Sequence, residues 1–156
     1  MLSQRARYAI RAMLNIAPRA GPVSAATVAA EEAIPRKFLE AILADLKKAG
    51  LVESTRGAMG GYRFAKPSAE ISFADVLRVI DGPLALAPCA SRTAYRQCDD
   101  CRDVETCETR KTLLAVRDAT AAILEGRHFG LSGGDKAGDR PLPLAPESKA
   151  PRGADG

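Results

Sequence analysis

The chain has no tryptophan and a single histidine, and aromatic residues make up only 4% of its 156 residues. The one histidine, His128, lies near the C-terminal end. We find no Ser-His-Asp set, no glycine-rich phosphate loop, and no paired carboxylates in an apolar setting. A C-x-x-C pair is present, but without the βαβ pattern of a thiol oxidoreductase. These absences argue against an enzyme and against a small-molecule substrate.

Long apolar runs are also missing. The N-terminus, MLSQRARYAIRAML, is interrupted by Arg5, Arg7 and Arg11 before the apolar core of a secretory signal can build up. No stretch approaches the ~18–20 apolar residues of a membrane-spanning helix. We therefore expect a cytoplasmic protein without a membrane partner. Thiols are kept reduced there, so clustered cysteines indicate metal ligands or redox sensors more than structural disulfides.

The residues that are present favour one helical domain with a basic first part. Apolar residues make up 46% of the chain, enough for a core. Residues 1–66 carry 11 Lys and Arg against 5 Asp and Glu, whereas residues 67–156 carry 12 against 14, so the first part holds more than the whole net charge of +4. A basic module beside a slightly acidic one suggests binding to a polyanion, although charge alone also fits a solvated surface.

Three helices are predicted in the first 50 residues. Ser3 and Ser24 are suitable N-caps for the first two, and Pro35 suits the first position of the third, which Gly50 ends. The expected buried faces recur at helical spacing: Ala6, Ala9, Ile10, Met13 and Ile16, then Leu39, Ile42, Leu43 and Leu46. Because the second and third helices are joined by a short turn, they predict a helix-turn-helix.

The next elements predict a winged helix-turn-helix. LVEST and GYRFA flank the glycine-bearing turn RGAMG and indicate a β-hairpin. We expect a mainly α fold with a small β-hairpin wing, divided into a winged-helix DNA-binding domain (1–82), a cysteine-rich sensor loop (83–107), a long dimerisation helix (108–128) and a disordered tail (129–156). The first domain includes a helix capped by Ser72. The long helix could instead pack back on its own winged helix, but few elements remain to cover its apolar stripe.

In this fold the start of the second helix of the helix-turn-helix enters the major groove. The expected DNA-binding residues lie at that start, at the cap of the preceding helix, and on the wing: Arg36, Lys37 and Phe38; Ser24; Arg56, Gly57, Gly60, Gly61 and Arg63. The arginines suit guanine edges or phosphate, and the glycines allow a tight wing tip. For each basic residue alone, and for Arg63 above all, an ordinary surface charge is the alternative.

All four cysteines fall in one 19-residue stretch, CASRTAYRQCDDCRDVETC. Cys89, Cys98, Cys101 and Cys107 are separated by eight, two and five residues. Structural zinc prefers two C-x2-C pairs, and only Cys98 and Cys101 form one. Those two could also form a disulfide switch, and irregular loop spacing is common for iron–sulfur ligands. The chemistry of the residues leaves zinc, a cluster and a redox pair open.

Three segments together resemble the Rrf-two family of bacterial transcription regulators: MLSQRARYAIRAMLNIA, IPRKFLEAILADLKKAGLVESTRGAMGGYRFAKP and ISFADVLRVIDG. The resemblance covers about residues 1–126. It implies a cytoplasmic homodimer that binds a palindromic double-stranded DNA operator, and we expect a repressor. Several members, including the iron–sulfur cluster regulator, the nitric-oxide-sensing repressor and the rhizobial iron regulator, sense iron, cluster, nitric oxide or redox status through three cysteines before the dimer helix.

The resemblance favours an iron–sulfur cluster, 2Fe-2S or 4Fe-4S, over zinc or no metal. Cys89 and Cys107 match the first and last family cysteines, and either Cys98 or Cys101 is the middle one. The family's non-cysteine ligands are absent here. Arg7 replaces an aspartate of the nitric-oxide sensor, and Arg110 replaces a histidine of the cluster regulator. We therefore expect the fourth cysteine to supply the fourth ligand. The alternative is the same regulator with a thiol–disulfide switch or structural zinc.

Overall fold

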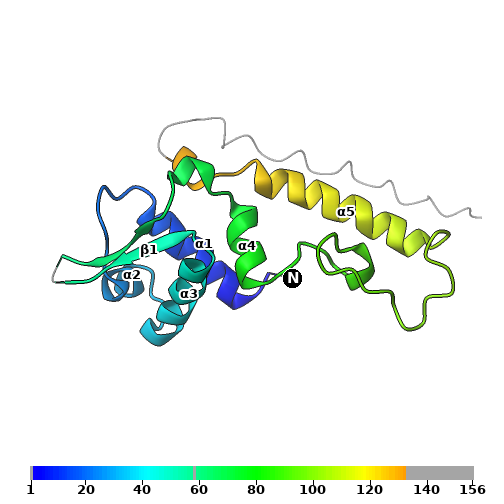
Figure 1. Cartoon of the computed structure of the whole chain (residues 1–156), viewed down its shortest axis with the longest axis horizontal. Helices are drawn as coiled ribbons and strands as arrows, with labels where there is room; N and C mark the ends of the chain where they lie inside the picture. Colours follow the sequence, from blue (N-terminus) through cyan, green and yellow to red (C-terminus); the bar gives the residue numbers. More distant parts are fainter. Residues whose placement is uncertain (1, 58, 133–156) are drawn as a thin grey trace, which may run out of the picture.

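The computed structural model describes residues 2–57 and 59–132 (Figure 1). Its helices are α1 (Gln4–Ile16), α2 (Ala25–Glu31), α3 (Arg36–Lys48), α4 (Phe73–Ile80) and α5 (Glu108–Glu125), with strands β1 (Val52–Thr55) and β2 (Gly61–Phe64) and three short 3-10 turns, η1 (Ser68–Glu70), η2 (Pro88–Ala90) and η3 (Phe129–Ser132). The predicted order of three helices, hairpin, helix and long helix is confirmed. None of the described helices is long and apolar enough to cross a membrane.

The helix starts follow the capping signals. The hydroxyls of Ser3 and Ser24 accept from amides three residues on, at 3.0 Å each. Ser72 forms a reciprocal capping box with Asp75 at the start of α4. Pro35 differs slightly from the prediction, because its ψ of 124° keeps it extended, and α3 begins one residue later.

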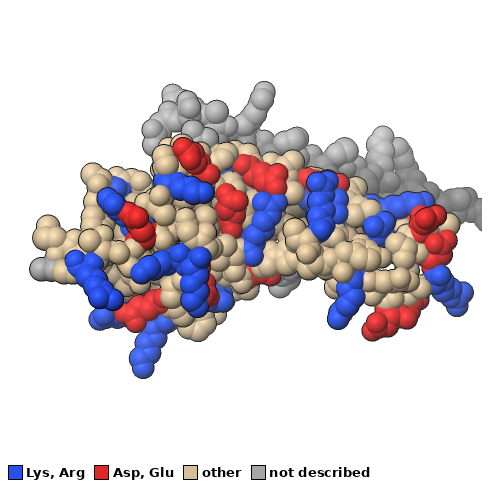
Figure 2. Space-filling model, in the orientation of Figure 1, with Lys and Arg blue, Asp and Glu red and all other residues tan. Residues whose placement is uncertain are grey.

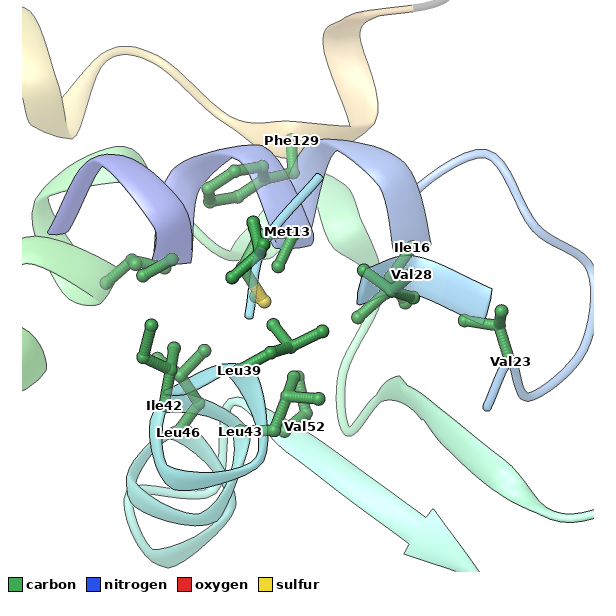
Figure 3. Close-up of a cluster of buried hydrophobic side chains, with 14 of the residues drawn as sticks. Met13, Ile16, Val23, Val28, Leu39, Ile42, Leu43, Leu46, Val52 and Phe129 are labelled. Atoms are coloured by element: carbon green, nitrogen blue, oxygen red, sulfur yellow. The ribbon is translucent and has the colours of Figure 1, made fainter. Parts of the chain in front are cut away.

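The predicted faces of α1 and α3 form the core. Figure 3 shows side chains from several elements meeting there, with the α3 stripe opposite Met13. Ala6, Ala9, Met13 and Ile16 are buried, whereas Ile10 is only partly buried. Leu39, Ile42, Leu43 and Leu46 are all fully buried. The helical periodicity therefore located the core of the winged helix.

The turn between α2 and α3 contains a strained residue. Ala33 has a φ of 48°, in the left-handed region that glycine occupies readily and alanine does not. The amide of the next residue, Ile34, bonds to the carbonyl of Ala29 at 2.9 Å, and the Ile34 side chain is buried. The short turn thus bends the chain sharply enough to set α3 across α2.

The wing is a two-stranded antiparallel hairpin in which Val52 pairs with Phe64 and Thr55 with Gly61. Tyr62 also exchanges two main-chain hydrogen bonds with Val23, at 2.8 and 2.9 Å, which attaches the hairpin to the segment before α2. A Cβ at Gly61 would lie 2.4 Å from the Val23 carbonyl group. Glycine at position 61 is therefore needed for this attachment.

The predicted tail boundary at residue 129 is wrong. Phe129 is 1% exposed and joins the core of the winged helix, where Figure 3 shows it with Met13. Main-chain bonds flank it: the Phe73 amide donates to the Arg127 carbonyl at 2.8 Å, and the Phe129 amide to the Ile71 carbonyl at 3.2 Å. Burial of this large ring outweighs the Gly- and Pro-rich composition that follows it. The remainder of the predicted tail, residues 133–156, lies outside the described residues.

Helix α5 runs from the cysteine loop back to the winged helix (Figure 1). It contacts α4 and η2, and Arg78 of α4 pairs with Glu125 near its end. None of its side chains is buried, and Val116 and Ile123 are 40% and 52% exposed. Its apolar stripe is therefore largely uncovered within one chain.

Candidate DNA-binding surface and cysteine loop

The start of α3 presents Arg36, Lys37 and Phe38 at the surface, as predicted. Arg36 Nε donates to Glu40 Oε1 at 2.8 Å, one helical turn further on. This bond uses one of the five guanidinium N–H donors and orients the group along the helix, which leaves the other donors for an approaching acceptor. The arrangement suits pairing with a base edge or a phosphate.

Phe38 is an exposed aromatic side chain beside these charges. It is 49% exposed, and its ring meets the edge of Tyr8 with centroids 6.3 Å apart. Gln4 donates to the Tyr8 hydroxyl at 2.9 Å, so α1 supports the ring from behind. Neither Tyr8 nor Gln4 was predicted to take part in the site, because their proximity to Phe38 depends on helix packing.

Ser24 is exposed, and its hydroxyl also makes hydrogen bonds with α2. Its hydroxyl accepts from the Thr27 amide and lies 2.8 Å from the Thr27 hydroxyl. The two hydroxyls therefore form a pair at the start of α2. Thr27 was missed by the sequence analysis, although a position three residues after an N-cap is the expected location of such a partner.

The wing tip carries Arg56, Gly57 and Met59 at the surface, and Met59 is 89% exposed. Gly57 has a φ of 111°, and a Cβ at Gly60 would lie 2.3 Å from the Thr55 carbonyl oxygen. The absence of a side chain at Gly60 therefore lets the hairpin backbone approach itself at the turn. Met59 was not among the predicted residues.

Arg63 lies on β2 and pairs with Glu53, its cross-strand partner in the hairpin register. This ion pair supports the interpretation of Arg63 as a residue of the hairpin surface. Figure 2 shows that acidic and basic side chains alternate over the winged helix on the face in view. The face in view in Figure 2 therefore carries no unbroken basic patch over the described residues of the winged helix.

The cysteines occupy different environments in the loop. Cys89 is buried in η2, Cys98 is exposed, and Cys101 and Cys107 are partly buried. A hydrogen bond with the Cys89 side chain raises the pKa of the Cys98 thiol, and the nearby Asp100 and Cys101 raise it further. Cys107 is the N-cap of α5, and its sulfur accepts from the Arg110 amide at 3.4 Å.

Two arginines of α5 hold the first part of this loop. Arg110 Nε donates to the Cys89 carbonyl at 3.0 Å, and Arg117 donates to the Ala90 carbonyl at 2.7 Å. The Arg110 guanidinium also lies 5.9 Å from the centre of the Tyr95 ring. From the sequence, Arg110 was predicted only to replace a ligand, and no role was predicted for Arg117.

The donor set fits an iron–sulfur cluster in its chemistry. Thiolates are the usual ligands of such clusters, and the Cys89 and Cys101 side chains both raise the pKa of the Cys98 thiol. Among the described residues, however, no group of three or more Cys, His, Asp or Glu side chains is close enough to hold a metal ion. Cluster binding by three or more of these thiolates would therefore require the loop to rearrange.

The fold and the exposed helix start define a winged-helix transcriptional regulator. The Rrf2 family model, described as an iron-dependent transcriptional regulator, matches residues 2–129, and the chain belongs to this Rrf2 (Rrf-two) family. An rrf2-like HTH-type transcriptional regulator of Rhodobacter capsulatus is 43% identical over 121 residues, which cover 74% of this chain and 81% of that protein.

Two solved structures share the fold. CymR (YrzC), the global cysteine regulator of B. subtilis, is 27% identical with a TM-score of 0.67, over 83% of this chain and 92% of that one. The IscR of T. potens is 27% identical with a TM-score of 0.65, over 83% and 82% of the two chains. These relatives are transcriptional regulators and not enzymes, and the chain is likewise a DNA-binding transcriptional regulator.

Proposed function

We propose that the chain acts as a homodimeric repressor that binds a palindromic operator, and that a cluster held by its cysteines controls this binding. The observation that carries the proposal is that Cys89 and Cys107 both attach to the first turn of α5 through one residue, Arg110. Arg110 therefore joins both ends of the cysteine stretch to the start of the dimer helix. The similarity to an IscR, and the family's description as iron-dependent, support iron as the metal.

In the proposed complex, α3 enters the major groove and the wing lies along the backbone. Arg36 donates to a base edge or a phosphate, Lys37 supplies a point charge, and Phe38 provides an apolar surface for a thymine methyl group. Ser24 and the wing tip at Arg56 and Gly57 contact phosphates, which set the position of α3 but not the sequence it recognises.

The uncovered stripe of α5 supports the homodimer. Val116 and Ile123 are exposed on α5, and a groove beside it is lined by further apolar residues, among them Leu2 and Leu86, which are 49% and 68% exposed. Exposed apolar residues gathered beside one helix support an interface there. A second copy pairing along α5 would set two α3 helices at a fixed separation, as two half-sites require.

The thiolates of Cys89, Cys98, Cys101 and Cys107 would hold the cluster, which supplies a centre whose assembly depends on iron, sulfide and oxidation state. The chain's own part is to bring Cys89 and Cys107 toward the loop thiols and so order residues 83–107. Cys107 caps α5, and the Cys89 carbonyl accepts a hydrogen bond from Arg110 of α5. Ordering of the loop therefore changes the position of α5 relative to the winged helix. Operator affinity then depends on the state of the loop.

Iron, sulfide and zinc analysis of anaerobically purified protein tests the sensor. We expect a coloured protein with iron and sulfide, lost in Cys89→Ala and Cys107→Ala. A Cys98→Ala preparation with a full, unchanged cluster would remove Cys98 as the fourth ligand. Colourless, zinc-loaded protein, or a reversible disulfide without iron, would contradict the cluster and leave the alternative of structural zinc or a thiol switch.

A gel-shift titration tests the DNA-binding residues, with a duplex selected by the wild-type protein from a random-sequence library. Arg36→Ala should weaken binding by ~10-fold or more, as for loss of a bidentate base contact. Arg56→Ala should weaken all sequences alike and reduce the salt slope by about one. Lys111→Ala, on α5, is the matched control and should change neither. Unchanged binding by Arg36→Ala would contradict its role.

A further inference from the structure

Arg110 and Arg117 are seven residues apart on α5, which is close to two helical turns, so they lie on nearly the same face. Their Cα atoms are separated by ~10 Å of helical rise. Even so, their guanidinium groups reach the carbonyls of adjacent residues, Cys89 and Ala90. The two side chains therefore converge on the same point of the η2 turn.

The η2 turn depends on these arginines for two of its carbonyls. Its own bonds run from the amides of Ala90 and Ser91 to the carbonyls of Ala87 and Pro88, at 3.0 and 3.1 Å. The carbonyls of Cys89 and Ala90 accept from α5 instead. Cys89, Ala90 and Ser91 are buried, at 7%, 0% and 7% exposed. Releasing the arginines would leave buried acceptors without these donors, which is unfavourable.

The Arg117 side chain is largely buried and held by several hydrogen bonds. Its side chain is only 12% exposed, and its guanidinium also donates to Asp118 at 2.6 and 2.9 Å. The hydrogen bond from Arg117 lowers the pKa of the Asp118 carboxyl, as does Arg92 of the loop, which pairs with it at 3.1 Å. Arg117 is thus a nearly buried cation held by a carboxylate on one side and the η2 turn on the other.

We propose that Arg110 and Arg117 form a two-point clasp that fixes the Cys89 turn to α5 and transmits the ligation state of Cys89 to that helix. The transmission rests on the proposed sensing function; the clasp itself does not. When Cys89 moves toward the other thiols, the two carbonyls move with it, and either α5 follows or the clasp breaks. Both outcomes make the position of α5 depend on the loop. Arg110 and Arg117 are positioning residues, not ligands.

The first arm of the test uses reduced, metal-free full-length protein and needs no cluster. Iodoacetamide labelling followed by mass spectrometry gives the alkylation rate of Cys89. We expect Arg110→Ala and Arg117→Ala to raise this rate by ~10-fold or more, because a charge-assisted hydrogen bond restrains the buried turn. Far-UV circular dichroism of each variant reports general unfolding. Lys111→Ala is the control: it removes an α5 cation that pairs with Glu108 among the described residues, and it should leave the rate unchanged.

Arg117→Lys separates charge from geometry. Lysine keeps the positive charge but lacks the planar fork that serves Ala90 and Asp118 together, so this variant should also expose Cys89. An unchanged Cys89 rate in both alanine variants would overturn the clasp. An increase accompanied by loss of the helical circular dichroism signal would also overturn it, because it would show general loss of structure.

The second arm measures the ratio of operator affinities of the cluster-loaded and metal-free forms. A ratio different from one in the wild-type protein supports the proposed function. If Arg110 and Arg117 transmit the ligation state, the ratio should fall toward one in Arg110→Ala and Arg117→Ala. If the ratio differs from one in the wild-type protein and is the same in both variants, the proposed transmission through Arg110 and Arg117 is overturned. If the wild-type ratio is one, the sensing function fails, and the Cys89 rate alone decides whether the clasp exists.

Discussion

The ring of Phe129 is stacked on that of Phe73, with centroids 4.6 Å apart and planes inclined by 10°. Phe64, on wing strand β2, lies 5.8 Å from the same ring. The chain that leaves α5 therefore returns to the base of the wing and the start of α4. Together with the arginine clasp at its other end, this contact fixes α5 to the rest of the protein at both ends.

Replacing Phe129 with alanine should destabilise the protein strongly. The ring is 1% exposed and contacts two other aromatic rings, so its loss leaves a cavity in the core. We expect the free energy of unfolding to fall by ~3–5 kcal/mol. Urea unfolding measures it, with Met59→Ala as the control because that side chain is 89% exposed. A loss below about 1 kcal/mol would show that residue 129 is not part of the core.

Replacing Ala33 with glycine should stabilise the protein. Ala33 has a φ of 48°, which costs an alanine ~1–2 kcal/mol, whereas glycine adopts it freely. The greater freedom of glycine in the unfolded chain offsets ~0.5–1 kcal/mol of this. A net gain of up to ~1.5 kcal/mol follows and would be seen as a higher melting temperature. Ala30→Gly, inside α2, is the opposite control and should destabilise.

Gly61→Ala should disturb the wing. The added Cβ would lie 2.4 Å from the Val23 carbonyl group, so the two main-chain bonds between Val23 and Tyr62 must lengthen or break. We expect weaker operator binding together with faster amide exchange at Tyr62, measured by hydrogen–deuterium exchange. Gly21→Ala is the control, since nothing lies within 4 Å of a Cβ there. Equal behaviour of the two variants would contradict this role for Gly61.

The ion pair between Arg5 and Asp45 joins α1 to α3 and should make stability depend on acid. The Arg5 hydrogen bond holds the pKa of the Asp45 carboxyl below its usual 3.8. Because the folded-state pKa is the lower one, the stabilisation is fully present above 3.8 and is lost as the pH falls through the folded-state pKa. Urea unfolding at about pH 5 and about pH 3 should show a smaller loss in Asp45→Asn than in wild type. Equal losses would contradict the pairing.

The winged helix was predictable because its signals are local. Ser3, Ser24 and Ser72 mark helix starts by hydrogen bonds only three residues long, and the α3 stripe repeats at helical spacing. Phe129 was not predictable, because its burial depends on partners more than 50 residues away in sequence, and Gly- and Pro-rich composition follows it.

The candidate site was predictable in its residue types and less so in its contacts. The cysteine cluster is evident from sequence, but the attachment of Cys89 to Arg110 spans 21 residues and depends on how the loop folds back on α5. The spacing of Arg110 and Arg117 is a weak signal, since many helices carry arginines seven residues apart. For Arg63, only the hairpin register shows that Glu53 lies opposite.

The proposed function requires that the cysteine loop controls operator binding through an iron–sulfur cluster. The most direct measurement is the dissociation constant for the selected operator, determined anaerobically for cluster-loaded and metal-free protein at one salt concentration. We expect the two constants to differ by ~5-fold or more, and Cys89→Ala to bind like the metal-free form whatever iron and sulfide are supplied. Equal constants for the two forms of the wild-type protein would contradict it.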